Sequence, residues 1–139
     1  MYLVDTSVWI HALRPAGNPT VRSLLRPLII SAEAAVTHWI LLELMTGLRK
    51  SETRETLLTW FKPIQCLQFP QYSHRWDEIW ENAARLRKRG LAVTAADCFI
   101  ATAAIEHKVP LVHCDPDFEA MKPALPLKTL DWTSHVRDR

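Results

Sequence analysis

The sequence contains few cysteines, and their arrangement gives no sign of a structural bridge or a metal site. Cys66, Cys98 and Cys114 are odd in number and widely spaced, and no CxxC pair or Cys/His ligand spacing is present. We therefore expect neither a disulfide framework nor a zinc site. Reduced thiols are typical of the cytoplasm, which is the location we expect.

Long hydrophobic runs and a strong charge of one sign are also missing. No segment reaches the roughly 18 apolar residues that a membrane helix needs. The N-terminus meets Asp5 at once and has no basic region before it, which argues against a signal peptide. We expect no membrane association. The formal net charge is only +2, so any contact with nucleic acid must come from a local basic patch.

The length of the chain predicts one compact domain covering residues 1–139. Its hydrophobic content of 48% allows a full core at this length. Short apolar runs that predict strands alternate with longer segments of helical periodicity. This alternation indicates an α/β fold with a central, mostly parallel sheet. The predicted strands are 2–4, 34–37, 64–69, 111–113 and 127–130. The predicted helices are 6–13, a short one stopped near Pro27, 38–49, 51–61, 72–89, 95–107 and one opening at 115–118.

Acidic residues follow two of the predicted strands. Asp5 comes directly after the first strand, and Asp115 follows the strand at 111–113. Ligand sites in parallel sheets lie beyond the carboxyl ends of the strands. Each residue also has a simpler interpretation, because Asp is a favoured helix cap and Asp-Pro is a common turn. Taken singly, Asp115 fits the structural role better, whereas Asp5 fits either.

Two further acids occupy apolar helical surroundings. Glu43 lies among leucines, where a lone charge is costly unless it is paired or bound to a metal. The alternatives are a buried ion pair, with Arg49 for example, and a functional site. Asp97 follows Thr94 by three residues, the spacing of a capping box, but it also shares a face with the core residues Ile100 and Ala101.

Taken together, the acids suggest a metal site. Unneutralised carboxylates that converge at one sheet edge repel each other, and a hard divalent cation resolves that conflict. Ligand sets made only of oxygen favour Mg²⁺ or Mn²⁺. An acidic cluster without an evident nucleophilic Ser or Cys suggests metal-assisted hydrolysis of a phosphodiester. A haloacid-dehalogenase-like phosphatase is rejected, because it needs an acid two residues after Asp5, where Ser7 stands.

Four segments together resemble the acidic motifs of PIN-domain ribonucleases. They are Leu3–Ile10, Leu41–Gly47, Thr94–Ala103 and Val109–Phe118, in the family's order and spanning nearly the whole chain. The resemblance implies a three-layer PIN-like α/β fold with four to five strands and helices on both faces. It also implies Mg²⁺, or Mn²⁺, and endonucleolytic cleavage of RNA.

The resemblance assigns roles by motif position. It implies that Asp5, Glu43, Asp97 and Asp115 are catalytic acids and that Asp5, Asp97 and Asp115 bind the metal. It leaves open whether Asp117 joins them, and it gives Thr6 and Ser7 an orienting role. A stand-alone domain of this length resembles the VapC toxins, which implies a cognate antitoxin and a homodimer.

Substrate binding is less clearly marked. Arg87 and Arg89 lie in a basic helix end that could contact RNA, although such residues ordinarily complement the helix dipole. The six histidines show no ligand spacing and receive no role. The alternative to a nuclease is a catalytically silent PIN-like module that binds RNA or protein.

Overall fold

A parallel sheet forms the centre of the computed structural model, which describes residues 1–68 and 74–136. Every strand pairing in it is parallel, and the strand order is β3-β2-β1-β4-β5. The strands are β1 (Tyr2–Val4), β2 (Ala34–Val36), β3 (Gln65–Cys66), β4 (Leu111–His113) and β5 (Thr129–Asp131). The predicted α/β class with a parallel sheet of up to five strands is confirmed.

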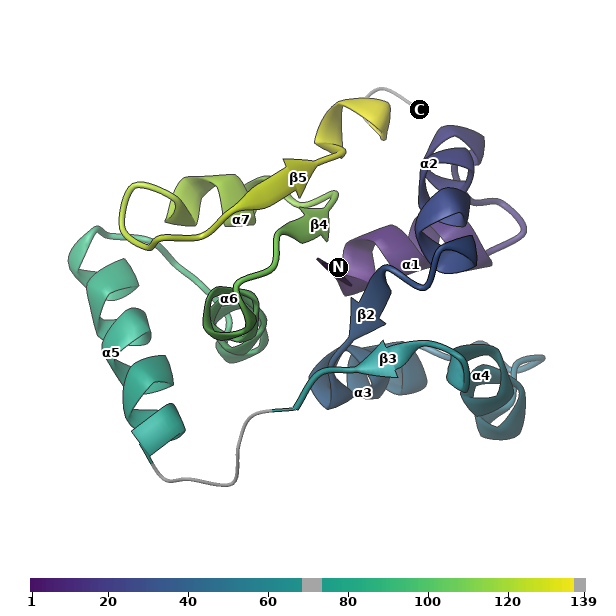
Figure 1. Ribbon diagram of the computed structural model, residues 1–139, viewed down its shortest axis with the longest axis horizontal. Coiled ribbons are helices and arrows are strands. Elements are labelled where there is room, and N and C mark those ends of the chain that lie inside the picture. Colours follow the sequence, from purple (N-terminus) through teal and green to yellow (C-terminus); the bar gives the residue numbers. More distant parts are fainter. Residues whose placement is uncertain (69–73, 137–139) are drawn as a thin grey trace.

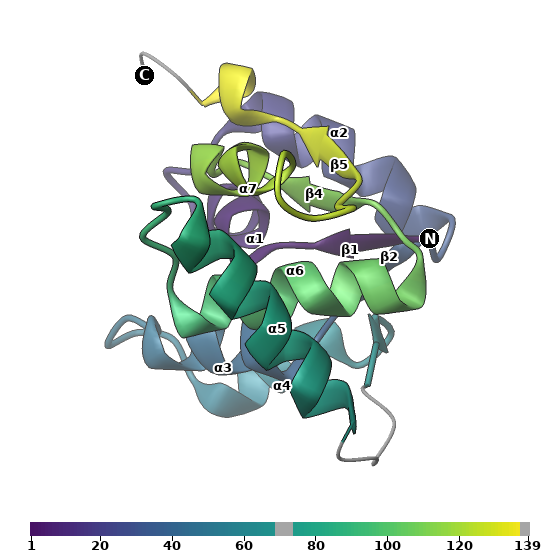
Figure 2. The same ribbon diagram turned by 90° about the vertical axis from the view of Figure 1, so that its left-hand side faces the viewer.

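Helices cover both faces of the sheet, as the resemblance to PIN domains implies (Figure 1). They are α1 (Thr6–Leu13), α2 (Pro19–Ile30), α3 (His38–Thr46), α4 (Arg54–Phe61), α5 (His74–Lys88), α6 (Ala95–His107) and α7 (Pro116–Met121). Helices α1 and α2 lie on one face, while α5 and α6 lie on the other. Figure 2 shows α5 crossing in front of α6, and α3 contacts both α1 and α6. None of the helices in the described ranges has the length and hydropathy needed to cross a membrane.

The central strands are held in a fully apolar layer. Leu3 and Val4 of β1 and Leu111 of β4 have no exposed surface. Trp9 is equally buried, and its indole Nε1 donates a hydrogen bond to the Val4 carbonyl oxygen over 3.0 Å. This bond satisfies the ring's one polar group and fixes α1 against β1 at the carboxyl end of the strand. The start of α1 therefore has a defined position beside the sheet edge.

Proline does not end the second helix. The helix that the sequence places before Pro27 continues as α2 to Ile30. Pro27 and Ser23 face solvent, so the Ser23 carbonyl that loses its helical donor can be hydrated. Leu28 and Ile29, beyond the proline, pack against the core. Their burial favours continuing the helix past the proline.

Other predicted boundaries shift by a few residues. Helix α3 ends at Thr46, and α4 begins only at Arg54 because the Thr53 hydroxyl caps it by accepting the Thr56 N–H. The predicted strand 64–69 is shortened to Gln65–Cys66, and the strand at 127–130 shifts to Thr129–Asp131. Residue 69, residues 72–73 of the predicted long helix and residues 137–139 lie outside the described residues.

Strands β1 and β4 are neighbours at the point where the order of strands in the sheet reverses direction. From β1 the chain builds β2 and β3 on one side, and then it returns to place β4 on the other side of β1. Ligand sites in open α/β sheets lie at such a switch point, beyond the carboxyl ends of the strands. Asp5 directly follows β1, and Asp115 comes shortly after β4, so both lie at this edge.

Candidate metal centre

Asp5 connects β1 to α1 and is almost completely buried, with an exposed fraction of 4%. Its backbone N–H donates to the Val112 carbonyl of the adjacent strand over 2.9 Å. Its Oδ2 atom caps α1, accepting the Ser7 backbone N–H at 3.0 Å and the Ser7 hydroxyl at 2.6 Å. Burial raises the pKa of Asp5 despite these hydrogen bonds. Asp5 is thus a helix cap as well as a buried acid at the sheet edge.

Ser7 links the two strand ends. While its hydroxyl donates to Asp5, the same oxygen accepts the Cys114 backbone N–H over 3.0 Å. One side chain therefore holds the residue after β1 and the residue after β4 in a fixed relation. The Cys114 thiol is not a nucleophile, because burial and the charges of Asp5 and Asp131 raise its pKa to about 12.

Three carboxylates from two separate elements meet beside this edge. Asp97 comes from the first turn of α6, and Asp115 and Asp117 come from the start of α7. One oxygen from each lies within 4.8 Å of the others. Asp115 also caps α7, because its Oδ1 accepts the Asp117 backbone N–H over 3.0 Å. The two interpretations of Asp115, as a cap and as a functional acid, are compatible.

The pKa of Asp97 is raised by its surroundings. Burial raises its pKa to about 6, and the charges of Asp5, Asp115 and Glu43 act in the same direction. Its backbone N–H donates to the Thr94 hydroxyl over 3.1 Å, so the helix cap expected at Thr94 is present. The cap uses the backbone of Asp97, and a hydrogen bond from Thr94 to its carboxylate offsets only part of the rise in pKa.

Glu43 lies close to this group, and none of the ion pairs among the described residues joins it to an arginine. The hydroxyl of Thr6 donates to its Oε1 over 2.8 Å. Burial raises the pKa of Glu43, and the charge of Asp5 adds to the effect. The alternative of an ion pair with Arg49 is not realised, since Arg49 is exposed and its backbone N–H binds Glu52. Thr6 instead connects Glu43 to the start of α1, next to Asp5.

The chemistry of this donor set fits a hard divalent cation. Within the part of the chain that the structure describes, none of the ion pairs neutralises Asp5, Asp97, Asp115 or Asp117. The raised pKa values record the cost of holding several carboxylates together in a buried place. Carboxylate oxygens at this separation are the ligands that Mg²⁺ and Mn²⁺ prefer. A cation would remove the repulsion that the protein alone leaves in place.

Comparison with known proteins decides the family. The sequence profile of the PIN domain matches residues 2–122. The chain belongs to the PIN-domain family. A VapC ribonuclease of Mycobacterium bovis is 30% identical over 130 residues, covering 87% of this PIN domain and 91% of the relative. Nucleases of the PIN family use a divalent metal, in agreement with the acidic cluster.

Solved structures share the fold of this PIN domain. A VapBC2 complex from Rickettsia felis bound to promoter DNA superposes with a TM-score of 0.74 at 21% identity, covering 94% of this chain and 98% of that one. A member of the VapBC family of toxin–antitoxin systems from Mycobacterium tuberculosis gives a TM-score of 0.65 at 22% identity, covering 93% and 96%. The three-layer PIN-like arrangement expected from the sequence is confirmed.

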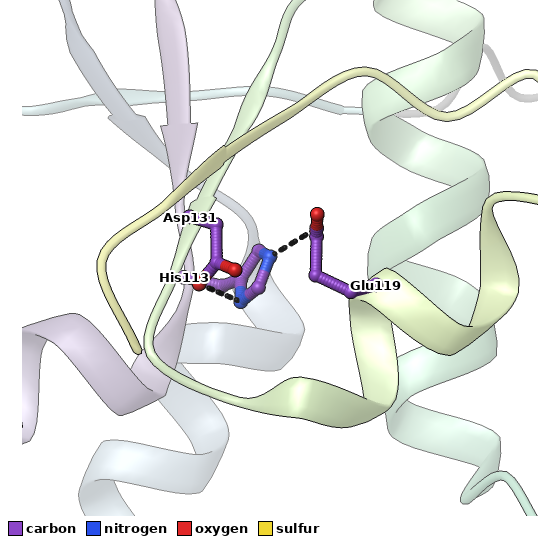
Figure 3. Close-up of side chains that lie close together, drawn as sticks. All are labelled: His113, Glu119 and Asp131. Atoms are coloured by element: carbon purple, nitrogen blue, oxygen red, sulfur yellow. Dashed lines mark hydrogen bonds and ion pairs between the residues drawn. The ribbon is translucent and has the colours of Figure 1, made fainter. Parts of the chain in front are cut away.

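His113, to which the sequence analysis assigns no role, has its ring between Glu119 and Asp131 (Figure 3) and stands two residues before Asp115. Its ring is fully buried at the end of β4. The Nε2 atom lies 2.8 Å from Glu119 Oε2, and Nδ1 accepts the Asp115 backbone N–H over 3.1 Å. The only sequence feature that marks His113 is that a polar residue ends the apolar run 111–112. This feature does not identify the residues that its ring contacts.

The raised pKa of Asp97 predicts how stability depends on pH. Its usual pKa is 3.8 and its folded value is about 6, so between these values the folded protein binds more protons than the unfolded chain. The stability of the metal-free PIN domain should therefore fall as pH rises through this window. We expect the melting temperature in EDTA to drop by a few degrees, on the order of 3 °C, between pH 4.5 and 7.

Asp97→Asn provides the control for this measurement. The amide does not titrate, so the fall in melting temperature should become clearly smaller in this variant. Saturating Mg²⁺ should also reduce the fall in the native protein, because the cation favours the ionised carboxylates. An identical pH profile for the native protein and Asp97→Asn would contradict the assignment of the shift to Asp97.

Proposed function

We propose that this PIN domain is a metal-dependent endoribonuclease that acts as the toxin of a toxin–antitoxin pair. The observation that carries the proposal is the convergence of Asp97, Asp115 and Asp117, with oxygens within 4.8 Å and no neutralising ion pair among the described residues. Helix capping explains the backbone hydrogen bonds of these acids. It does not explain why several carboxylates without neutralising partners lie together. Family membership and the named VapC ribonuclease relative support cleavage of RNA.

The residues divide into those that would hold the cation and those that would position them. We assign Asp5, Asp97 and Asp115 to the metal, and Asp117 offers a further carboxylate oxygen beside those of Asp97 and Asp115. Mg²⁺ is the proposed ion, with Mn²⁺ as a substitute. When bound, a divalent cation supplies Lewis acidity that activates water and offsets charge on the scissile phosphate.

The protein's own contribution is to orient the acids and to accept a proton. The Ser7 hydroxyl fixes one oxygen of Asp5, and the Thr6 hydroxyl fixes one oxygen of Glu43. We assign to Glu43 the role of accepting a proton from water that attacks in line with the leaving oxygen, a role that its raised pKa supports. The expected products carry a 5′-phosphate and a 3′-hydroxyl.

A cleavage assay with controlled metal tests this proposal. Purified protein should cleave structured RNA in Mg²⁺ or Mn²⁺, lose cleavage completely in EDTA and regain it when either ion is added back. Melting curves in the same buffers should show stabilisation by the ion, because a ligand of the folded state raises its apparent stability. A silent binding module, the competing function, would bind RNA equally well with and without metal and cleave none.

The proposed partners are a cognate antitoxin and a second copy of the chain. The fold is shared with the VapBC complexes described above. The product of the adjacent gene is the candidate antitoxin. Co-expression should yield a complex that suppresses RNA cleavage, whereas the isolated chain should cleave RNA and elute as a homodimer in size-exclusion chromatography.

The RNA itself is proposed to contact the basic end of α5. Arg87 and Arg89 are both exposed there, and the Arg89 guanidinium donates to the Pro123 carbonyl beyond α7 over 3.1 Å. This bond brings the basic end of α5 to the segment that follows α7, the helix that carries Asp117. A connection of only residues 89–94 then leads from α5 to α6, which carries Asp97.

Charge reversal tests this RNA-binding surface. The double variant Arg87→Glu/Arg89→Glu should weaken RNA binding and make the dependence of log K on log salt shallower by about 0.7 for each phosphate that the variant no longer neutralises. Binding should be measured in Ca²⁺ or EDTA, without turnover, at several salt concentrations. Arg54→Glu, at an exposed residue of α4, is the matched control. Equal salt slopes for the native protein and the double variant would exclude this surface.

A further inference from the structure

We propose that His113 is a positioning residue that holds the metal-binding turn between β4 and α7 in place through both of its ring nitrogens. The inference rests on the proposed metal site and adds a residue to which neither the family motifs nor the comparisons assign a role. His113 ends β4, and the two acids Asp115 and Asp117 follow within four residues. Figure 3 shows its ring between Glu119 of α7 and Asp131 of β5.

The hydrogen bonds of the ring determine its tautomer. The Asp115 backbone N–H can only donate, so Nδ1, at 3.1 Å, must be the acceptor and carries no proton. The proton then lies on Nε2, which donates to Glu119 Oε2 over 2.8 Å. Although partial burial raises the pKa of Glu119, hydrogen bonds from Thr129 and His113 lower it on balance, so the carboxylate is an effective acceptor. Glu119 thereby selects the tautomer that can hold Asp115.

The surroundings prevent the ring from taking another position. His113 has no exposed surface, and its ring centroid lies 5.3 Å from that of Phe118. The backbone carbonyl of His113 accepts the Trp132 N–H over 2.8 Å, and this bond fixes the end of β4 against the residue that follows β5. Asp131 Oδ1 lies 3.9 Å from Nδ1, beyond hydrogen-bond distance, and accepts the Thr133 N–H instead. The ring therefore acts as a rigid support.

Two consecutive hydrogen bonds connect the His113 ring to the acids Asp115 and Asp117. His113 holds the Asp115 N–H, and Asp115 Oδ1 in turn holds the Asp117 N–H over 3.0 Å. Glu119 anchors the far side of the ring on α7, so the turn is tied to both elements that flank it. Residues outside the ligand set that orient metal ligands typically change metal affinity about 10–100-fold when they are replaced. We expect an effect of this size from the loss of the Nδ1 acceptor.

Two substitutions of His113 separate positioning from packing. Asn places its amide oxygen near the position of Nδ1, whereas Gln reaches the position of Nε2 and leaves the Asp115 N–H without an acceptor. Mn²⁺ affinity, measured by titration calorimetry of the full chain, should fall about 10-fold or more in His113→Gln and change by less than about threefold in His113→Asn. Both variants lose the ring, so their metal-free melting temperatures should fall by similar amounts.

A second pair avoids the core, because the Glu119 side chain is 32% exposed. Glu119→Ala removes the acceptor of Nε2 and frees the ring to carry its proton on Nδ1, which can no longer accept from Asp115. Glu119→Gln keeps an acceptor oxygen at the same place. Mn²⁺ affinity should fall about 10-fold in Glu119→Ala and stay within about threefold in Glu119→Gln. If His113→Gln does not fold, the two Glu119 variants alone test the positioning role of His113.

The outcomes distinguish this inference from the proposed function. If the native protein binds Mn²⁺ and Asp97→Asn does not, the metal centre stands. Equal Mn²⁺ affinities within each pair, whether both unchanged or both reduced, would then overturn the positioning role alone. If the native protein binds no Mn²⁺, the metal centre is wrong and the positioning role is overturned with it.

Discussion

Replacing Asp97 with Asn is expected to reduce RNA cleavage on the order of 10²–10³-fold while leaving the fold intact. Asp97 lies at the start of α6, where its backbone caps the helix and its carboxylate meets Asp115 and Asp117. Asn has nearly the same shape and keeps the backbone hydrogen bond to Thr94, so the substitution removes the charge alone. A Lewis-acid ion contributes several kcal/mol to such a reaction, and about 1.36 kcal/mol corresponds to a tenfold change in rate.

The same substitution should stabilise the metal-free protein. Burial and the charges of Asp5 and Asp115 raise the pKa of Asp97, so its ionised form is unfavourable in the fold at neutral pH. Asp97→Asn should therefore melt at a higher temperature than the native protein in EDTA at pH 7. A change that lowers activity and raises stability is the expected behaviour of a residue kept for function.

An exposed acid provides the matched control. Asp77 lies in the first turn of α5, a position comparable to that of Asp97 in α6, but it faces solvent. Asp77→Asn should leave cleavage and metal dependence within about twofold of the native values, because exposed substitutions change energies by only about 0.5 kcal/mol. The measurement is the initial rate of RNA cleavage at saturating Mg²⁺. Native-like rates in Asp97→Asn would remove the central support for a metal-dependent nuclease.

The sequence could predict the sheet and its functional edge because both depend on local patterns. Short apolar runs followed by Asp5 and Asp115 mark two strand ends, and parallel pairing brings the ends of adjacent strands together. The family resemblance supplied the order of the motifs. The convergence of Asp97 with Asp115 follows from both being at the amino ends of helices that begin at this edge.

Other features depend on distances that no local pattern contains. The bridge from Ser7 to Cys114 joins residues 107 positions apart, and it exists only because β1 and β4 are neighbours. The approach of Glu43 to Thr6 depends on how α3 contacts α1. The continuation of α2 past Pro27 depends on which side of the helix faces solvent. Likewise, His113 shows no ligand spacing because its partners come from α7 and from the backbone of its own turn.

The relation between Asp115 and Asp117 is the point at which sequence reasoning left alternatives open. Asp115 is partly buried and caps α7, whereas Asp117 is exposed in the first turn of that helix. Both offer an oxygen to the group that includes Asp97. His113 fixes the backbone N–H of Asp115, and the Asp117 N–H fixes its carboxylate oxygen Oδ1, so this carboxylate is the better preorganised ligand.

We therefore expect unequal effects when each residue is changed to Asn. Asn is as good a helix cap as Asp, so Asp115→Asn should keep α7 and remove only the charge. Cleavage should fall about 10²-fold or more in Asp115→Asn, because a direct ligand is removed, and about 10-fold or less in Asp117→Asn. The decisive measurement is the Mg²⁺ concentration for half-maximal cleavage, together with Mn²⁺ affinity by calorimetry. A larger loss of metal affinity in Asp117→Asn than in Asp115→Asn would reverse the assignment and make Asp117 the direct ligand.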